Sequence, residues 1–355
     1  MIQFVRHPVF TLISCLLMIS ITTIAQDDQL ERISPEQAGF SSEKLIELGS
    51  YLENVGSSSL LIISDGKVFY EWGDIHKKYL IHSIRKAILN SLYGIYIEKG
   101  MIDTSATLAE IGIDDIEPGL TELEKSAKVI DLLKSRSGIY HKAAAESSGM
   151  VESRPKRGSS KPGEAYYYNN WDFNTLGAIF EKMTGKSIFT AFYEDVAQPI
   201  GMLQYKGLYD SINTSNPNVE IPETDGYYQY EPGKSKYPAY HFRMSAYDLG
   251  LYGILYANKG KWKGKQIVPE KWIEYSTEPL SIVNEEYGIA RGILWGVNLK
   301  YASFEHSGYG GQLLRIYPNS KIVFVHRVND EDGEILFQEN NIYPIFGILF
   351  GAKID

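Results

Sequence analysis

The sequence predicts an α/β fold of the α+β type, in which one antiparallel sheet is flanked by helices and carries an inserted helical subdomain. Three observations support this prediction. Strand patterns occur near both ends of the chain, at about 55–80 and about 290–355. Helical patterns and loops fill the stretch of about 87–280 between them. The 355 residues, of which 44% are hydrophobic, suffice for the core of one domain over 26–355.

The first strands form a hairpin that leads into a helix. Strands at 59–64 and 67–72 flank an Asp-Gly turn at 65–66. Apolar residues then recur at a spacing near 3.6 residues over 83–100, which predicts a helix with one apolar face. The elements that follow from caps, turns and apolar runs are a helix after Ser41 or Ser42, a surface loop over 147–163, a helix over 176–184 that ends at Gly185, a helix capped by Ser245, strands at 313–317 and 322–328, and a closing helix over 341–352.

Composition and charge exclude several classes of protein. The formal net charge is −9 and no basic run is present, so nucleic acid is not expected as a partner. The seven histidines are scattered and no His-Glu-x-x-His motif occurs, so a metal site is not expected. An aromatic content of 13% argues against a disordered chain.

The N-terminus is typical of a signal peptide. A short basic head precedes an uncharged, mostly apolar run that ends in Thr-Ile-Ala. We expect residues 1–25 to be cleaved and the remainder to be exported, to the periplasm or outside the cell. The alternatives are a retained membrane anchor and a lipid on Cys15, the only cysteine, so we expect contact with a membrane only through this segment. Cleavage leaves no cysteine for a disulfide or a thiolate site.

The pattern Ser-x-x-Lys places a hydroxyl and an amine one helical turn apart. A neutral lysine amine can then take the proton of the hydroxyl. The pattern occurs at 41–44, 83–86 and 153–156. The first match is better explained as a helix cap, and the third lies in a polar loop. Only Ser83 opens a strongly apolar helix with Lys86 near the core, although Ser83 taken alone also fits a helix cap.

Two further motifs carry chemistry. Tyr168 and Asn170 form Tyr-x-Asn, although Tyr167 fits the same pattern in another register and each of these tyrosines also fits a packing role. A tyrosine can act as a base or proton relay when nearby cations stabilise its phenolate. A His-Ser-Gly motif begins at His306, where small residues beside a strand let a substrate backbone approach closely. His306 alone also fits a buried structural histidine.

In this combination and order, the motifs resemble the serine β-lactamase and penicillin-binding-protein superfamily, in its class C-like branch. That branch carries S-x-x-K, then Y-x-N, then K/H-x-G. The serine and tyrosine are 85 residues apart here, and the tyrosine and histidine 138, which suits the branch. Segments that resemble the family lie at 60–72, 132–139, 176–185 and 199–202, and the family's spacing selects Tyr168 as the motif tyrosine.

The resemblance implies a β-lactamase/transpeptidase-like fold with its site between the sheet and the insertion. It implies that Ser83 is the acylated nucleophile and that Lys86 activates it. Tyr168 would be the base for acylation and for the water that later frees the acyl group. His306 would complete the catalytic group by donating a hydrogen bond or tuning the Tyr-Lys pair. No metal or organic cofactor is implied.

The resemblance also implies substrate-binding residues. Asn170 would orient the substrate amide or the lysine, and Gly308 would allow close approach at the strand edge. The backbone N–H groups of Ser83 and Tyr309 would form the oxyanion hole. A departure from the family is His306, which stands where many β-lactamases have a lysine that holds a carboxylate better.

Other departures lie near the expected cleft. Tyr240 and His241 stand where many members have two glycines, which predicts a narrower and more polar cleft. Arg243 fits either recognition of a substrate carboxylate or a structural ion pair.

Together, these features predict an exported serine hydrolase that cleaves an ester or an amide through an acyl-serine intermediate. The bond would belong to a β-lactam, a D-amino-acid peptide or a carboxylic ester, so the expected partner is a small-molecule or short-peptide substrate. The alternative is a catalytically silent protein that binds or senses cell-wall peptides on the same fold. The sequence leaves the oligomeric state open.

Overall fold

The computed structural model describes residues 28–354 except 332, 334 and 335. The predicted signal peptide over 1–25, with Cys15 in it, lies outside the described residues, so its cleavage stays a prediction. Within the described range, no helix has the length and apolar character needed to cross a membrane.

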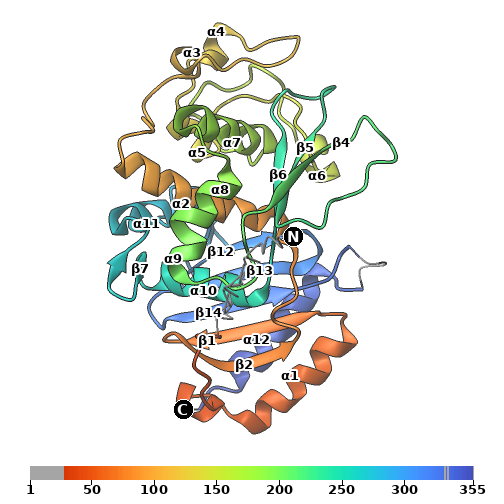
Figure 1. The fold of residues 1–355 in the computed structure, drawn as a ribbon, viewed down its shortest axis with the longest axis vertical. Helices are drawn as coiled ribbons and strands as arrows, with labels where there is room; N and C mark the ends of the chain where they lie inside the picture. Colours follow the sequence, from red (N-terminus) through yellow and green to blue (C-terminus); the bar gives the residue numbers. More distant parts are fainter. Residues whose placement is uncertain (1–27, 332, 334–335, 355) are drawn as a thin grey trace, which may run out of the picture.

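An eight-stranded antiparallel sheet forms one half of the molecule, in the order β2-β1-β14-β13-β12-β11-β10-β9 (Figure 1). Its strands are β1 Ser59–Ser64, β2 Lys67–Gly73, β9 Ser281–Asn284, β10 Ile289–Arg291, β11 Gly296–Asn298, β12 Ser303–Gly308, β13 Gln312–Tyr317 and β14 Ile322–Arg327. The N-terminal strand β1 pairs along its whole length with the C-terminal strand β14. The prediction of one sheet built from both ends of the chain is therefore confirmed.

The helices lie on both faces of this sheet and in the inserted part. They are α1 Ser42–Asn54, α2 Arg85–Glu98, α3 Leu108–Ile111, α4 Glu122–Lys125, α5 Val129–Leu133, α6 Ser148–Glu152, α7 Asn170–Thr184, α8 Ile188–Phe192, α9 Gln198–Ile200, α10 Ala246–Ala257, α11 Glu270–Ser276 and α12 Ile342–Gly351. Short 3-10 turns precede α1, α2 and α12.

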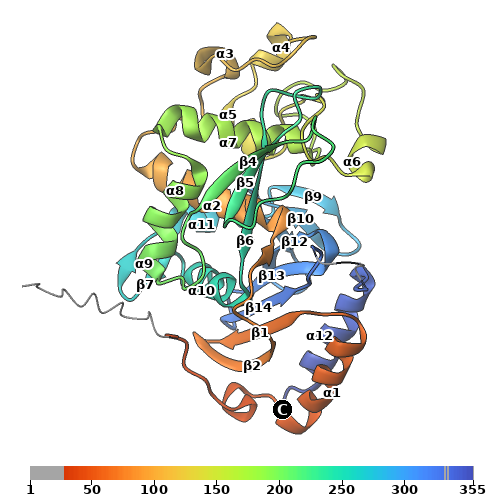
Figure 2. The same cartoon turned by 45° about the vertical axis from the view of Figure 1, so that its right-hand side comes forward.

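Two hydrophobic clusters hold the sheet between its helices. Leu60 and Ile62 of β1 pack with residues of α1 and α12, whereas Leu61 faces the other side, toward α10. The helices α1 and α12 lie on one face of the sheet and α10 on the other (Figure 2). The fit of α10 against the sheet requires glycine, because a Cβ on Gly253 would lie only 2.3 Å from Cγ1 of Val323. β1 is apolar at successive positions because successive side chains point to opposite faces and both faces are covered.

The inserted part contains strands as well as helices, which corrects the expectation of a helical insertion over about 87–280. A second sheet, ordered β3-β6-β5-β4, lies beside α7 (Figure 1). Its strands are β3 Tyr79–Leu80, β4 Tyr209–Asn213, β5 Gly226–Tyr230 and β6 Ala239–Met244. The sequence pattern missed β4 because four of its five residues are exposed, which leaves no alternation of apolar and polar positions. The main sheet also resumes earlier than predicted, at Ser281 rather than about 290.

Most element ends agree with the local signals. Asp65 and Gly66 have φ values of 44° and 81°, the left-handed region that a two-residue hairpin turn uses. Ser41 caps α1, Gly185 ends α7 at φ 71°, and Ser245 caps α10. α7 begins six residues earlier than predicted, and the expected surface loop over 147–163 contains the one-turn helix α6.

Candidate active site

A serine–lysine pair lies at the start of α2. Ser83 is in the 3-10 turn His82–Ile84, and the α-helix follows from Arg85. Nζ of Lys86 lies 2.9 Å from Oγ of Ser83. The lysine is 1% exposed, whereas Ser83 is only partly buried. The hydroxyl is therefore within reach of a substrate, and its amine partner is inside the protein.

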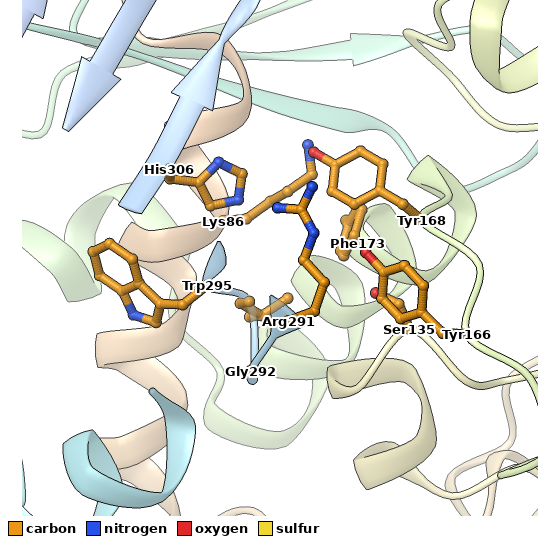
Figure 3. Close-up of a pocket in the computed structure, with 10 residues that line it drawn as sticks. Lys86, Ser135, Tyr166, Tyr168, Phe173, Arg291, Gly292, Trp295 and His306 are labelled. Atoms are coloured by element: carbon orange, nitrogen blue, oxygen red, sulfur yellow. The ribbon is translucent and has the colours of Figure 1, made fainter. Parts of the chain in front are cut away.

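Tyr168 reaches this pair from the segment before α7. The side chain of Ser83 lowers the pKa of its phenol, so the two hydroxyl groups are neighbours. Nζ of Lys86 lies 4.9 Å from the centre of the Tyr168 ring and 4.7 Å from that of Phe173 (Figure 3). The neighbouring Tyr167 instead donates its hydroxyl to the carbonyl of Met150, at 2.6 Å. The structure thus brings together the serine, the lysine and the tyrosine of the family register.

The third motif lies on β12, beside the turn that carries the nucleophile. His306 is buried, and its Nδ1 lies 3.1 Å from the carbonyl oxygen of Ser307. A Cβ on Gly308 would lie 2.4 Å from the carbonyl oxygen of Ile81, so only glycine allows this approach. β11 pairs with residues 303–305 of β12 and ends there. The outer edge at 306–308 is therefore without a strand partner in the described part of the chain.

Lys86, Tyr168 and His306 line one pocket, and Ser83 is not among its lining residues (Figure 3). It is lined by Lys86, Ser135, Tyr166, Tyr168, Phe173, Arg291, Gly292, Leu294, Trp295 and His306. The lining has two cations, two phenols and no carboxylate. Arg291 comes from β10, and its Nε is buried without a hydrogen-bond partner in the described structure. Sequence reasoning missed this arginine, because strand pairing brings it to the site from about 200 residues beyond the nucleophile.

The charges around Lys86 favour a neutral amine. Burial, with further contributions from the guanidinium groups of Arg85 and Arg291, holds the pKa of Lys86 well below its usual value of 10.5. Among the described residues, none of these three cations has an ion pair with a carboxylate. Uncompensated positive charge and low solvent exposure act in the same direction on a lysine.

The phenol and the imidazole are also neutral in this environment. Burial raises the pKa of Tyr168 above its usual value of 10.0, and the side chain of Ser83 and the charge of Arg85 offset part of that rise. Burial, followed by the charge of Lys86, holds the pKa of His306 well below 6.5. A lysine amine that can accept a proton therefore meets a phenol that can donate one.

Of the two roles expected for Asn170, orienting the substrate amide or orienting the motif lysine, the second is not seen, because its side chain bonds other groups. Its side-chain carbonyl accepts from Arg85 at 3.5 Å, and its amide donates to the carbonyl of Ala145. Arg85 also donates to Asn174 at 3.2 Å and lies 4.3 Å above the ring of Tyr240. The extra cation in the Ser-x-Arg-Lys motif draws the asparagine side chain toward itself.

Arg243, Tyr240 and His241 of β6 have partners within the protein. Arg243 was expected either to recognise a substrate carboxylate or to form a structural ion pair. The structure shows the ion pair, because the guanidinium donates to Glu331 through Nε and Nη2. Tyr240 and His241 are buried, and His241 stacks on Tyr227 with ring centres 4.6 Å apart. No group of three or more His, Cys, Asp or Glu residues that could hold a metal ion occurs in the described residues.

Comparisons with known proteins agree with this geometry. The family model described as beta-lactamase matches residues 52–343. The chain is 24% identical over 239 residues to “Putative D-alanyl-D-alanine carboxypeptidase” of Salmonella typhimurium, an alignment that covers 54% of each chain. The chain therefore matches about half the length of these curated relatives.

Solved structures share the fold. “Putative 6-aminohexanoate-dimer hydrolase from Bacillus anthracis” has a TM-score of 0.64 at 18% identity and covers 92% of this chain and 87% of its own. A family VIII carboxylesterase has a TM-score of 0.60 at 16% identity, with 87% and 97% covered. The family match spans most of the chain and includes every motif residue, so the chain belongs to the beta-lactamase family of serine hydrolases.

Proposed function

We propose that this protein is an exported serine hydrolase that cleaves an ester or amide bond through an acyl intermediate on Ser83. The observation that carries the proposal is the placement of one hydroxyl between two proton carriers. Oγ of Ser83 lies 2.9 Å from the amine of Lys86, and Ser83 is near enough to the phenol of Tyr168 to lower its pKa. A nucleophile beside a base, itself positioned by neighbouring groups, is the arrangement that acyl transfer requires.

The proposed reaction has two steps. In the first, Lys86 takes the proton of the Ser83 hydroxyl while Oγ attacks the substrate carbonyl. The backbone N–H groups of Ser83 and Tyr309 would bind the oxygen that becomes negative, and the leaving group departs with a proton. In the second step, water attacks the acyl-serine and gives a proton to the group that protonated the leaving group, Lys86 returns its proton to Oγ of Ser83, and the acid is released.

The pKa directions revise the role that the resemblance assigned to Tyr168. A phenol whose pKa is raised stays protonated at neutral pH, whereas a lysine whose pKa is depressed is ready to accept a proton. We therefore assign the base to Lys86 and proton donation to the leaving group to Tyr168. His306, neutral and buried beside both, would act as a hydrogen-bonding group rather than as a charge.

The substrate class rests on the site and on the named relatives. The free outer edge of β12 at 306–308 suits an extended backbone such as that of a short peptide. The relatives' names cover a carboxypeptidase, a 6-aminohexanoate-dimer hydrolase and a carboxylesterase. A carboxylic ester, a D-amino-acid peptide and a β-lactam are accordingly the three substrate classes that we propose. Asn170 and Gly308 would line the path of the substrate backbone.

Labelling with a fluorophosphonate tests this function. We expect one adduct per chain, located on Ser83 by peptide mapping, together with turnover of at least one member of a panel of p-nitrophenyl esters, nitrocefin and D-alanyl peptides. The physical reason is that a fluorophosphonate reacts only with a serine whose proton has an acceptor. An unlabelled protein that still binds cell-wall peptides would support the silent binding protein instead.

A further inference from the structure

The residue directly before the nucleophile has an unusual backbone conformation. His82 has a φ of 46°, a left-handed value that side chains with a Cβ rarely adopt. Such a conformation persists only where surrounding contacts hold it, and it is frequent at functional sites. On its N-terminal side, the backbone N–H of Ile81 donates a hydrogen bond to the carbonyl oxygen of Phe242, with N and O 2.9 Å apart.

The side chain of His82 is held by an acid from the far end of the chain. Its Nε2 donates to Oδ2 of Asp330, on the segment that follows β14. The side chain of Asp330 is 3% exposed, and its other oxygen has no hydrogen-bond partner in the described structure. Burying a carboxyl group costs free energy unless it is hydrogen-bonded, so the hydrogen bond from His82 to Asp330 is structurally important.

The neighbouring Glu331 anchors the same segment to the strands that lead into the nucleophile. Its carboxylate accepts from the backbone N–H of Leu80 at 3.2 Å and from Nε of Arg243 at 2.9 Å. Leu80 belongs to β3 and Arg243 to β6, which pair with each other. The segment after β14 is therefore bonded to both the turn that contains Ser83 and the strand β3 before it.

The 3-10 turn Tyr309–Gly311, which follows β12 and begins with the second proposed oxyanion donor, meets the same group of side chains. The ring of Tyr309 contacts His82 edge-on, with centres 5.7 Å apart at 78°. A Cβ on Gly308 would lie 3.1 Å from Cβ of His82, and one on Gly310 would lie 3.3 Å from Cβ of Asp330. His82 and Asp330 thus fill the space between the two backbone segments.

We propose that His82 and Asp330 are positioning residues that form a strut, fixing the separation of the Ser83 and Tyr309 N–H groups. This proposal rests on the hydrolase function proposed above. Oxyanion donors act at about 2.7–3.1 Å from the developing charge. A misplacement of about 1 Å costs about 100-fold in rate. The strut therefore acts on the transition state without touching the substrate.

Two variants remove the strut in different ways. His82→Gly keeps the left-handed turn, which glycine adopts without strain, and deletes the imidazole. Asp330→Ala deletes the carboxyl group and leaves the histidine. Asp330→Asn is the conservative variant, because it retains an oxygen that accepts from Nε2. His76→Asn is the matched control, since His76 contacts Gln204 and Tyr247 and lies outside the pocket.

The test compares an activated ester with its thiono analogue, in which sulfur replaces the carbonyl oxygen and accepts hydrogen bonds poorly. For the oxygen ester we expect kcat to fall about 10- to 100-fold in His82→Gly and Asp330→Ala, with KM within threefold of the unchanged protein. The kcat for the thiono ester should fall by a smaller factor, so the ratio of the oxygen-ester rate to the thiono-ester rate should decrease. Asp330→Asn should recover most of the ratio, and His76→Asn should leave it unchanged.

One result would overturn the strut: the ratio of the oxygen-ester rate to the thiono-ester rate stays constant in correctly folded His82→Gly protein, checked by circular dichroism, while the unchanged protein hydrolyses both esters. If both rates fall equally at that constant ratio, the two residues have a general structural role. If the unchanged protein hydrolyses neither ester and takes no fluorophosphonate, the hydrolase function fails and the strut fails with it.

Discussion

Replacing Lys86 with Met should lower kcat/KM by about 10³-fold, the middle of the range for losing a general base. Methionine has a similar length and no proton acceptor, so Ser83 would keep its packing and lose its base. The same change should raise stability by about 1–2 kcal/mol, because a buried amine beside two unpaired guanidinium groups is replaced by an apolar chain. Steady-state kinetics and thermal melts on the same samples measure both effects.

The stability gain should depend on pH in a defined direction. The pKa of Lys86 is depressed in the folded protein, so the unfolded chain binds more protons between the folded value and about 10.5. The stability of the unchanged protein therefore rises with pH through that window. The advantage of Lys86→Met should be largest at acid pH, below the folded pKa of Lys86, should fall as the pH rises through the window, and should disappear above about pH 10.5.

Lys44 supplies the matched control for this substitution. It has the same Ser-x-x-Lys spacing, is exposed, and donates to the carbonyl of Gly351 at 3.2 Å. Lys44→Met should leave both the activity and the pH dependence of stability unchanged. Full activity in Lys86→Met would contradict the assignment of the base.

Replacing Ser83 with Ala should reduce turnover by about 10⁴- to 10⁶-fold, the scale known for nucleophile removal in serine hydrolases. No acyl intermediate can form without Oγ, whereas the pocket and the oxyanion N–H groups persist. Substrate should therefore still bind, with a Kd close to the KM of the unchanged protein if chemistry limits turnover. Stopped-flow assays and equilibrium binding measure the two parts separately.

The other two motif serines are its controls. Ser41→Ala removes the cap of α1 and should cost about 1 kcal/mol of stability with no effect on kcat. Ser153→Ala removes an exposed hydroxyl that bonds the carbonyl of Gly149. Substantial turnover in Ser83→Ala, or its loss in Ser153→Ala, would show that the nucleophile lies elsewhere.

The fold was predictable where short-range signals determine it. The Asp65-Gly66 turn and the caps at Ser41 and Ser245 each depend on a few neighbouring residues, and the structure has them at the predicted places. The second sheet was not predictable in this way. Its strand β4 is exposed and pairs in parallel with β5, so its conformation depends on partners rather than on its own pattern.

The site shows the same division. The motifs located Ser83, Lys86 and Tyr168, which the structure brings together. They did not locate Arg291 or Asp330, because those residues arrive through strand pairing and a terminal segment, with no spacing rule that links them to Ser83. The effect of Arg291 on the lysine was therefore visible only in three dimensions.

The central claim is that Lys86 is a neutral base beside Ser83, and the pH dependence of fluorophosphonate labelling tests it most directly. We expect the rate of adduct formation on Ser83 to rise from acid pH and to level off well below pH 10.5, the usual lysine pKa. The plateau should persist into alkaline solution, because the pKa of Tyr168 is raised and the phenol keeps its proton. A rate that climbs about tenfold per pH unit up to about pH 10 would mean an ordinary lysine, and a flat profile would mean no titrating base. Either result would contradict the proposed mechanism.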